Sequence, residues 1–420
     1  MLGALSLAAT DPAMRCSAGA SARYRSRVPT PERSDLGVAP RAPRANGRAA
    51  TGRQRTAARA RPAAPVLVRV VRSGVEESVH RGHVIEAGVD GQVIRALGDP
   101  ELVVTLRSTV KPFGLVALIQ AGGVEAFDLS SAEIAILASS HSGEDMHVRT
   151  LQGLYRRARV AQGLLACGSE GAPLDELTAA RLARDGEKAS PIRHMCSGQH
   201  SVFLLLSRLK GWDPERYWEE GHPAQVAYRS AVARAFGVEP AALRLAIDGC
   251  GIPTYAFTLR EVARAYATLA EPAAVPATDV RHALAPALTI IRDSMMDNPE
   301  LVAGSRDRLD TSLMKAVPGR LVSKSGMEAL RGVAILRGPR SMGHESGPTG
   351  MAVKIEDGDG YDRGTWAASI EALRQAGVLD TSPLRQLARY HRPVDLDPHG
   401  RLVAESIADF ELVPVGELLR

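Results

Sequence analysis

A serine and a lysine three residues apart, Ser108 and Lys111, form the first candidate for chemistry, in the segment RSTVKP. On a helix, residues i and i+3 share a face, so the lysine amine can meet the serine hydroxyl. A neutral amine is a base that can take the proton of an otherwise inert serine, and N–H groups at a helix start favour developing negative charge. Serine is also a common N-cap, so the pair alone leaves a non-catalytic role open.

Two later segments carry the same residue types. Ser140-His141-Ser142 follows an apolar helical stretch within SSHSGED, and Lys324-Ser325-Gly326 follows an apolar strand within LVSKSG. In this order they resemble the Ser-x-Asn and Lys-Thr-Gly elements of serine β-lactamases, which accompany a Ser-x-x-Lys pair. A lysine on an edge strand is usually solvated, but a second lysine beside Lys111 would hold its amine neutral.

Two cysteine-bearing segments, HMCSGQH and DGCGIPT, are the remaining dense clusters. Cys196, His200 and Cys250 could ligate zinc, because thiolate and imidazole are ligands that zinc prefers. No CxxC pair accompanies them, so buried free thiols are the alternative.

The positive charge of the chain is concentrated at its N-terminus. Residues 1–62 hold 12 Arg, no Lys and 3 acidic residues, a local charge of +9, which leaves −4 for the body when taken from the total of +5. We expect residues 1–64 to be a disordered Arg/Ala/Pro-rich tail, because this stretch has little to bury. The mildly acidic body predicts no nucleic-acid partner.

Cysteine usage and hydropathy predict the compartment. Four cysteines are too few for a disulfide scaffold in 420 residues, which favours reduced thiols and a cytoplasmic protein. The body contains no apolar run of membrane-spanning length, so we expect no membrane partner.

The helices and strands that must position these residues are predicted to form an α+β fold. Residues 66–97 are β-branched and partly alternating, and with ELVVTL they predict an antiparallel meander. A helix is expected over 108–120, a helical lobe over roughly 145–300, and strands again in LVSKSG, GVAILRG and MAVKIEDG. This order predicts one catalytic domain, 65–420, with an antiparallel sheet flanked by helices and a helical lobe.

From about Val66 to the C-terminus the chain resembles the class 3 L-asparaginases, also called the asparaginase II family. The resemblance lies in RSTVKP, SSHSGEDMH, CSGQH, DGCGIPT, LVSKSG and VKIEDG, which occur in that order. It implies a serine β-lactamase/glutaminase-like fold and an amidohydrolase that converts L-asparagine to L-aspartate and ammonia, with no cofactor required. A small-molecule substrate and a homodimer are expected.

Carried over by motif, Ser108 and Lys111 are the catalytic pair, Ser140 is the second catalytic hydroxyl and Lys324 the second lysine. Lys111, kept neutral by Lys324, would deprotonate Ser108 directly or through Ser140. The resemblance leaves open which serine attacks.

The resemblance also implies three substrate-binding residues. Arg107 would order the nucleophile, while His200 and Asp248 would lie near the substrate, Asp248 on its α-ammonium group.

Zinc-binding members of the family hold the metal with cysteines that match Cys196 and Cys250, and with a lysine in CSGKH. Here that lysine is Gln199, and glutamine replaces a neutral amine donor poorly. Zinc held by Cys196 and Cys250 is therefore possible but not required, with binding weaker than in those members or with a water-filled shell in its place.

Three other functions stay open on the sequence. One is another serine amidase or β-lactamase-like hydrolase, although DGCGIPT and CSGQH have no role in β-lactam chemistry. The second is a non-catalytic relative that binds an amino acid, and the third is a zinc amidohydrolase with cysteine ligands.

Overall fold

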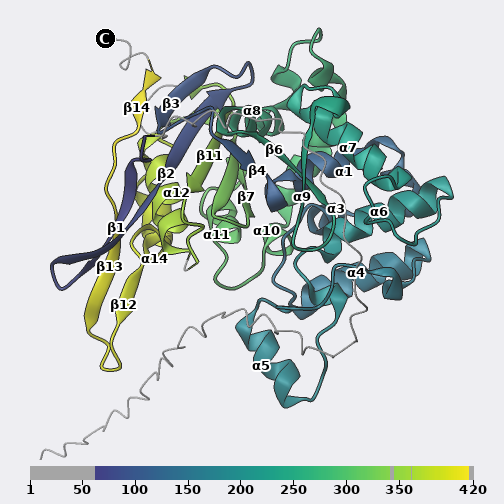
Figure 1. Cartoon of the computed structure of the whole chain (residues 1–420), viewed down its shortest axis with the longest axis horizontal. Coiled ribbons are helices and arrows are strands. Elements are labelled where there is room, and N and C mark those ends of the chain that lie inside the picture. The colour runs from purple at the N-terminus through teal and green to yellow at the C-terminus, as the bar shows by residue number, and fades with distance from the viewer. Residues whose placement is uncertain (1–61, 341–344, 361, 416–420) are drawn as a thin grey trace, which may run out of the picture. The chain divides into compact units, whose positions relative to one another are not determined.

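The computed structural model describes residues 62–340, 345–360 and 362–415 (Figure 1). The predicted tail, residues 1–64, therefore lies almost wholly outside the described residues. Contacts divide the chain into two units, and the larger one consists of residues 63–396 and 402–420. The described part of the smaller unit is Pro62 with residues 397–401.

Nine strands of the described residues form one antiparallel sheet. They are β1 (Val66–Arg72), β2 (Val75–Gly88), β3 (Val93–Leu97), β7 (Leu321–Gly326), β8 (Leu330–Ile335), β11 (Thr349–Ile355), β12 (Val394–Leu396), β13 (Leu402–Ala408) and β14 (Val413–Pro414). Their order is β12-β13-β1-β2-β11-β8-β7, with β3 paired to β2 and β14 to β3. The long β2 pairs with β1 through residues 75–81 and with β11 through residues 82–88.

The segment ELVVTL does not join that sheet, contrary to the predicted meander. Its strand β4 (Val103–Thr105) pairs with β6 (Pro253–Thr258), which also pairs with β5 (Arg244–Ile247) in a separate three-stranded sheet. A strand of three residues contributes few ladder bonds, so its pairing is decided by the tertiary neighbour and not by sequence order. A further short pair joins β9 (Gly338–Pro339) and β10 (Glu345–Ser346).

The helices fall into two groups, those of the lobe and those on the sheet. They are α1 (Lys111–Gln120), α2 (Gly123–Phe127), α3 (Ser131–Leu137), α4 (Asp145–Ala158), α5 (Glu176–Arg184), α6 (Ser197–Lys210), α7 (Pro223–Phe236), α8 (Leu259–Ala270), α9 (Ala285–Asp297), α10 (Pro299–Val302), α11 (Leu309–Ala316), α12 (Arg363–Gln375), α13 (Thr381–Gln386) and α14 (Ala388–His391). Short 3₁₀ helices are η1 (Arg107–Val110), η2 (Gln162–Leu164), η3 (Pro191–Arg193), η4 (Pro240–Ala242), η5 (Pro272–Ala274) and η6 (Val280–Leu284).

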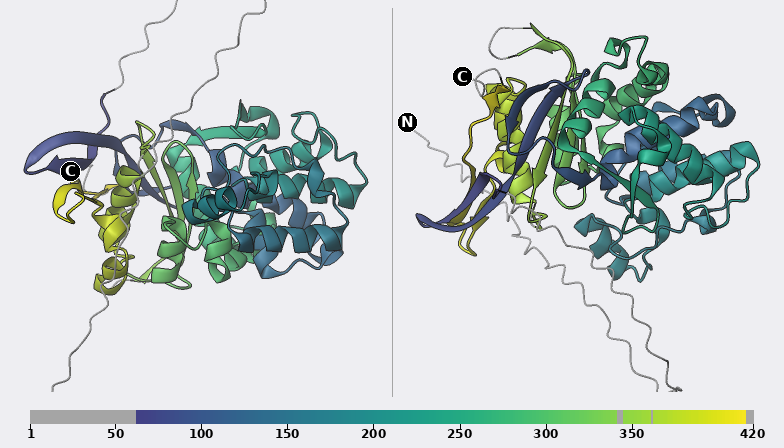
Figure 2. Two further views of the ribbon diagram at one scale, coloured as in Figure 1. Left: turned by 90° about the horizontal axis from the view of Figure 1, so that it is seen from below. Right: turned by 45° about the horizontal axis from the view of Figure 1, so that its top comes forward.

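Helix α1 is the centre of the lobe. Its sequence, KPFGLVALIQ, is apolar on every side, and nine of its ten residues are buried, as expected for a helix surrounded by others. It contacts α6, α7 and α9. The lobe therefore extends beyond the predicted 145–300 to include α1 and α3, and it lies to one side of the sheet in both figures (Figures 1 and 2).

Helices α8 and α12 pack on the sheet. Helix α8 contacts β2, β8 and β11, while α12 contacts β1, β8, β11 and β13 and also packs on α14. A capping box between Thr258 and Glu261 fixes the start of α8. This arrangement confirms the predicted α+β fold, an antiparallel sheet flanked by helices with a helical lobe.

Two glycines allow α8 to lie directly against the strands. A Cβ atom on Gly350 of β11 would come within 1.9 Å of the Ala263 carbonyl oxygen, and one on Gly332 of β8 would come within 2.1 Å of the Tyr266 ring. The Tyr266 hydroxyl in turn donates a hydrogen bond of 2.9 Å to the carbonyl of Thr109, the residue after Ser108. The sheet, α8 and the segment of the first catalytic candidate are thus in direct contact.

Within the described residues, no helix is long and apolar enough to cross a lipid bilayer.

Candidate active site

Ser108 and Lys111 lie at the start of a helix, as predicted for the segment RSTVKP. Ser108 is in η1, and Lys111 begins α1, with its backbone N–H bonded to the Ser108 carbonyl. Both residues are buried. The predicted helix over 108–120 is thus one tight 3₁₀ turn followed by an α-helix.

Arg107 has a strained backbone immediately before Ser108. Its φ of +47° lies in the left-handed region, which is costly for a residue with a side chain. The Arg107 guanidinium is held by an ion pair of 2.9 Å to the carboxylate of Asp248. Two of the predicted binding residues are therefore joined to each other, and their ion pair fixes the turn that presents Ser108.

The hydroxyl of Ser140 lies between the two lysines. Lys111 Nζ is 3.0 Å from Ser140 Oγ and Lys324 Nζ is 2.7 Å from it. Ser140 follows α3 in an irregular segment, and its backbone N–H is bonded to the Val302 carbonyl. The structure thus brings three of the four predicted catalytic residues into one hydrogen-bonded cluster.

Lys324 lies on β7, the edge strand of the sheet, yet it is completely buried. Strand β7 packs against η1, and the end of the strand approaches so closely that a Cβ on Gly326 would be 3.0 Å from the Leu106 carbonyl oxygen. Burial first, and the charge of Lys111 second, hold the pKa of Lys324 well below its usual value. Lys324 is therefore the amine whose neutral form the site favours.

Asp310, at the start of α11, fixes the strand that carries Lys324. Its carboxylate accepts hydrogen bonds from the Ser323 hydroxyl at 2.6 Å and from the Ser325 N–H and hydroxyl at 2.9 and 2.6 Å, and it forms an ion pair with Arg331. Burial would raise the pKa of Asp310, but Arg331 and Lys324 outweigh that effect and lower it. The carboxylate is therefore charged and fully bonded.

The Ser108 hydroxyl stands apart from this cluster. Among the described residues it forms no hydrogen bond with Lys111, whose amine is turned toward Ser140. Lys111 Nζ instead donates to the Ser139 carbonyl at 2.8 Å and the Met195 carbonyl at 3.4 Å.

Cys196 and Cys250 meet beside Lys111. Both thiols are buried, and Lys111 Nζ lies 3.5 Å from Cys196 Sγ. A hydrogen bond from the Cys250 thiol lowers the pKa of Cys196, and Lys111 lowers it further, whereas the same contact raises the pKa of Cys250. The Cys196 sulfur, whose pKa is lowered, therefore faces the Lys111 amine.

Gln199 and His200 point their polar atoms at tyrosines. Gln199 Nε2 donates to the Tyr228 hydroxyl at 3.0 Å, and His200 Nδ1 is bonded to the Tyr217 hydroxyl at 2.6 Å. Burial lowers the pKa of His200 to about 3, so the ring is neutral, and its Nε2 is a buried atom without a partner among the described residues.

The residues around Cys196 do not fit a zinc site of the family's kind. A tetrahedral zinc needs four ligands, and the two thiols supply two. The amide of Gln199, in the position of the family's lysine ligand, is engaged by Tyr228. In the part of the chain that the structure describes, no group of three or more His, Cys, Asp and Glu side chains could hold a metal ion.

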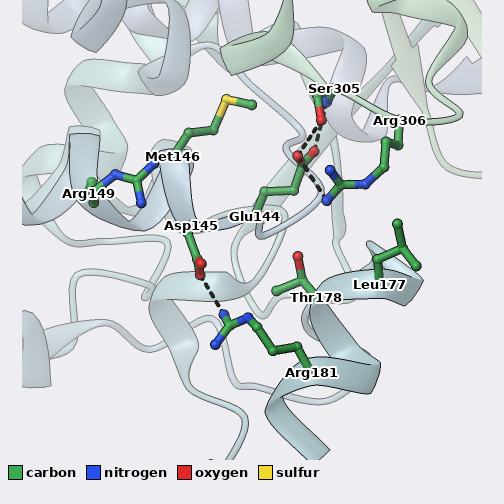
Figure 3. Close-up of a pocket in the computed structure, with 9 residues that line it drawn as sticks. All are labelled: Glu144, Asp145, Met146, Arg149, Leu177, Thr178, Arg181, Ser305 and Arg306. Carbon is green, nitrogen blue, oxygen red and sulfur yellow. Dashed lines mark hydrogen bonds and ion pairs between the residues drawn. The ribbon is translucent and has the colours of Figure 1, made fainter.

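A charged cavity of about 410 Å³ lies at the start of α4 (Figure 3). It is lined by Glu144, Asp145, Met146, Arg149, Leu177, Thr178, Arg181, Ser305 and Arg306. Ion pairs cross its wall, between Asp145 and Arg181 at 2.8 Å and between Glu144 and Arg306 at 3.2 Å. Its lining includes none of Ser108, Lys111, Ser140 and Lys324.

Sequence reasoning did not find Arg308 or Asp310. Arg308 donates a hydrogen bond of 2.9 Å to the Ser140 carbonyl, and Asp310 holds the lysine-bearing strand. Both lie in the segment RDRLDT, whose alternating charges are typical of a solvated turn, so no sequence signal marked them.

A serine hydroxyl flanked by lysine amines is an arrangement suited to acyl transfer, and the comparison with protein families agrees with it. The family model described as L-asparaginase II matches residues 68–407. The chain is therefore an amidohydrolase. It belongs to the L-asparaginase II family, which confirms the resemblance inferred from the six ordered motifs.

Solved structures give more distant likenesses. One titled as Mglu is 16% identical, with a TM-score of 0.33, and the alignment covers 72% of this chain and 69% of that one. The Bacillus subtilis glutaminase YbgJ, in covalent complex with 5-oxo-L-norleucine, is 13% identical with a TM-score of 0.34, and covers 71% of this chain and 89% of that one. No curated protein matches the sequence.

Proposed function

We propose that this amidohydrolase converts L-asparagine to L-aspartate and ammonia through a serine–lysine acyl-enzyme. The observation that supports it most is the Ser140 hydroxyl, which accepts hydrogen bonds from both Lys111 and Lys324 in a buried site. A hydroxyl held between two amines can give up one proton while it receives another, as a relay in general base catalysis requires.

We assign the base to Lys324, where the sequence favoured Lys111. Lys111 Nζ is already engaged by two carbonyls and lies beside the Cys196 sulfur. Lys324 faces fewer acceptors, and burial with a neighbouring cation favours its neutral form. Lys111 would then stabilise negative charge that develops in the reaction.

The steps of the reaction follow from these assignments. The Ser108 hydroxyl attacks the side-chain amide carbon and passes its proton through Ser140 to Lys324. The C–N bond then breaks, and the nitrogen leaves as ammonia with the proton returned from Lys324. Water attacks the resulting ester on Ser108 and gives its proton to Lys324. The bond between the acyl carbon and Ser108 Oγ then breaks, the proton returns from Lys324 to Ser108, and L-aspartate is released. The Lys111 side chain would stabilise the oxyanion.

An ammonia-release assay on L-asparagine, L-glutamine and a simple β-lactam tests the substrate. We expect L-asparagine to have the highest kcat/KM, and a preference for either other compound would contradict the proposal. A diazo-ketone analogue of asparagine, followed by peptide mass spectrometry, tests the nucleophile. We expect the adduct on Ser108, and its loss in Ser108→Ala. An adduct on Ser140 would show that Ser140 itself attacks.

A homodimer and a cytoplasmic location stay predictions of the sequence. Size-exclusion chromatography with light scattering of the purified chain tests the first of these.

A further inference from the structure

Arg308 is a cation beside the catalytic serine with no carboxylate partner. Its Nη2 donates to the Ser140 carbonyl at 2.9 Å, and the described residues offer it no ion pair. Its neighbours differ in this respect, since Arg306 is paired with Asp175 and Asp307 with Arg389. Among residues 306–308, Arg308 is thus the one whose charged side chain forms no ion pair within the described residues.

The charge of Arg308 is not neutralised by the carboxylates around it. Asp310, Asp362 and Glu144 act on it only at a distance. Asp310 is already bonded to Arg331 and to two serines, and Glu144 is bonded to Ser142, Ser305 and Arg306. A partly buried guanidinium without a paired anion is costly, and a bound anion relieves that cost. The site therefore favours a ligand with a negative group at this place.

Arg308 is also the accessible cation of the cluster. Lys111 and Lys324 are 1% and 0% exposed, whereas Arg308 is partly exposed. One of its nitrogens holds the Ser140 carbonyl, so the others are available, and a guanidinium binds a carboxylate through two parallel hydrogen bonds.

We propose that Arg308 binds the α-carboxylate of the substrate and so selects amino-acid amides over amides that lack this group. This inference rests on the proposed function, in which Ser108 and Ser140 act on the side-chain amide. Asp248, which is ion-paired with Arg107 beside Ser108, would take the α-ammonium group. Arg308 is then a specificity-determining residue that also positions Ser140 through its carbonyl.

The test uses L-asparagine and β-alaninamide, which is asparagine without its α-carboxylate. We measure kcat/KM for asparagine and the inhibition constant of β-alaninamide against it, in the wild type and in Arg308→Met. Loss of a charge-assisted hydrogen bond should lower kcat/KM for asparagine roughly 10- to 100-fold. The inhibition constant of β-alaninamide should change less than about threefold, because that compound has no group for Arg308 to bind.

Two further variants keep the outcome interpretable. Arg308→Gln retains a donor for the Ser140 carbonyl without the charge, and it should behave as Arg308→Met does while preserving that contact. Arg389→Met, which removes an exposed arginine of α14, is the matched control and should change neither constant.

Equal losses for asparagine and β-alaninamide in Arg308→Gln would overturn the inference, because they would show a purely structural role. An unchanged kcat/KM for asparagine would overturn it too. A wild-type enzyme that does not hydrolyse asparagine would instead count against the proposed function, so the two failures are distinguishable.

Discussion

The amine of Lys324 lies 2.7 Å from the hydroxyl of Ser140, and both groups are buried. An edge strand of the sheet supplies the lysine and the segment after α3 supplies the serine, so the sheet and the lobe must pack correctly for the contact to exist. The site is therefore a product of the whole domain and not of the Ser108-x-x-Lys111 motif alone.

Removal of the Lys324 amine should abolish most turnover. In Lys324→Met we expect kcat for ammonia release to fall roughly 100- to 10,000-fold, the usual contribution of a general base. The thermal midpoint should be retained or raised, because the variant removes a buried amine and keeps its volume. Lys315→Met, an exposed lysine of α11, is the control. A kcat within tenfold of the wild type would assign the base elsewhere.

The pH profile should have an acidic limb set by Lys324. The neutral amine is the active form, so kcat/KM should rise as pH increases through the lowered pKa of Lys324 and then level off. Lys111 is one cause of that lowering, so Lys111→Met should shift the limb to higher pH. Residual turnover, or the rate of labelling by the diazo-ketone analogue, provides the measurement. A limb that stays at the same pH would disagree with this coupling.

Chelation should leave the activity unchanged. The two thiols and the engaged Gln199 amide do not complete a zinc site, so dialysis against EDTA should alter kcat by less than about twofold. Gln199→Lys restores the amine ligand of the family, and we expect it to raise the zinc content toward one ion per chain, measured by mass spectrometry of the metal. Stoichiometric zinc in the purified wild type would refute this prediction.

Acid should weaken α12 through Glu371. Burial alone would raise the pKa of Glu371, but hydrogen bonds from Arg374, His391 and Gln375 lower it to about 2. A lowered carboxyl pKa stabilises the fold above the unfolded value of 4.5 and loses that contribution as pH falls toward 2. The loss should reach roughly 3 kcal/mol.

Urea unfolding at pH 6 and pH 3 measures this effect. The wild type should lose more stability between these conditions than Glu371→Gln does, whereas Glu219→Gln, at an exposed site, should behave as the wild type. Parallel losses in all three proteins would exclude Glu371 as the cause.

The ordered motifs and the main elements could be predicted because their signals are local. Apolar periodicity and capping residues mark α1 and α8, and an apolar run before Lys324 marks β7. The contacts that each site side chain makes in the folded protein could not be predicted in the same way. The protonation of Lys324 depends on how deeply an edge strand is covered, and the role of Arg308 depends on which carboxylates are already bonded; both are tertiary properties.

The close seating of α8 on the sheet has a consequence for how this enzyme can be altered. Gly332 and Gly350 leave room for α8 and for Tyr266, whose hydroxyl donates a hydrogen bond to the Thr109 carbonyl. The distance between α8 and the sheet therefore affects the position of the turn that carries Ser108. A methyl group added at either glycine would push α8 outward and tilt that turn, without touching any residue that meets the substrate. Substitutions at the contact between α8 and the sheet should therefore alter the rate of turnover as readily as substitutions of residues that bind the substrate.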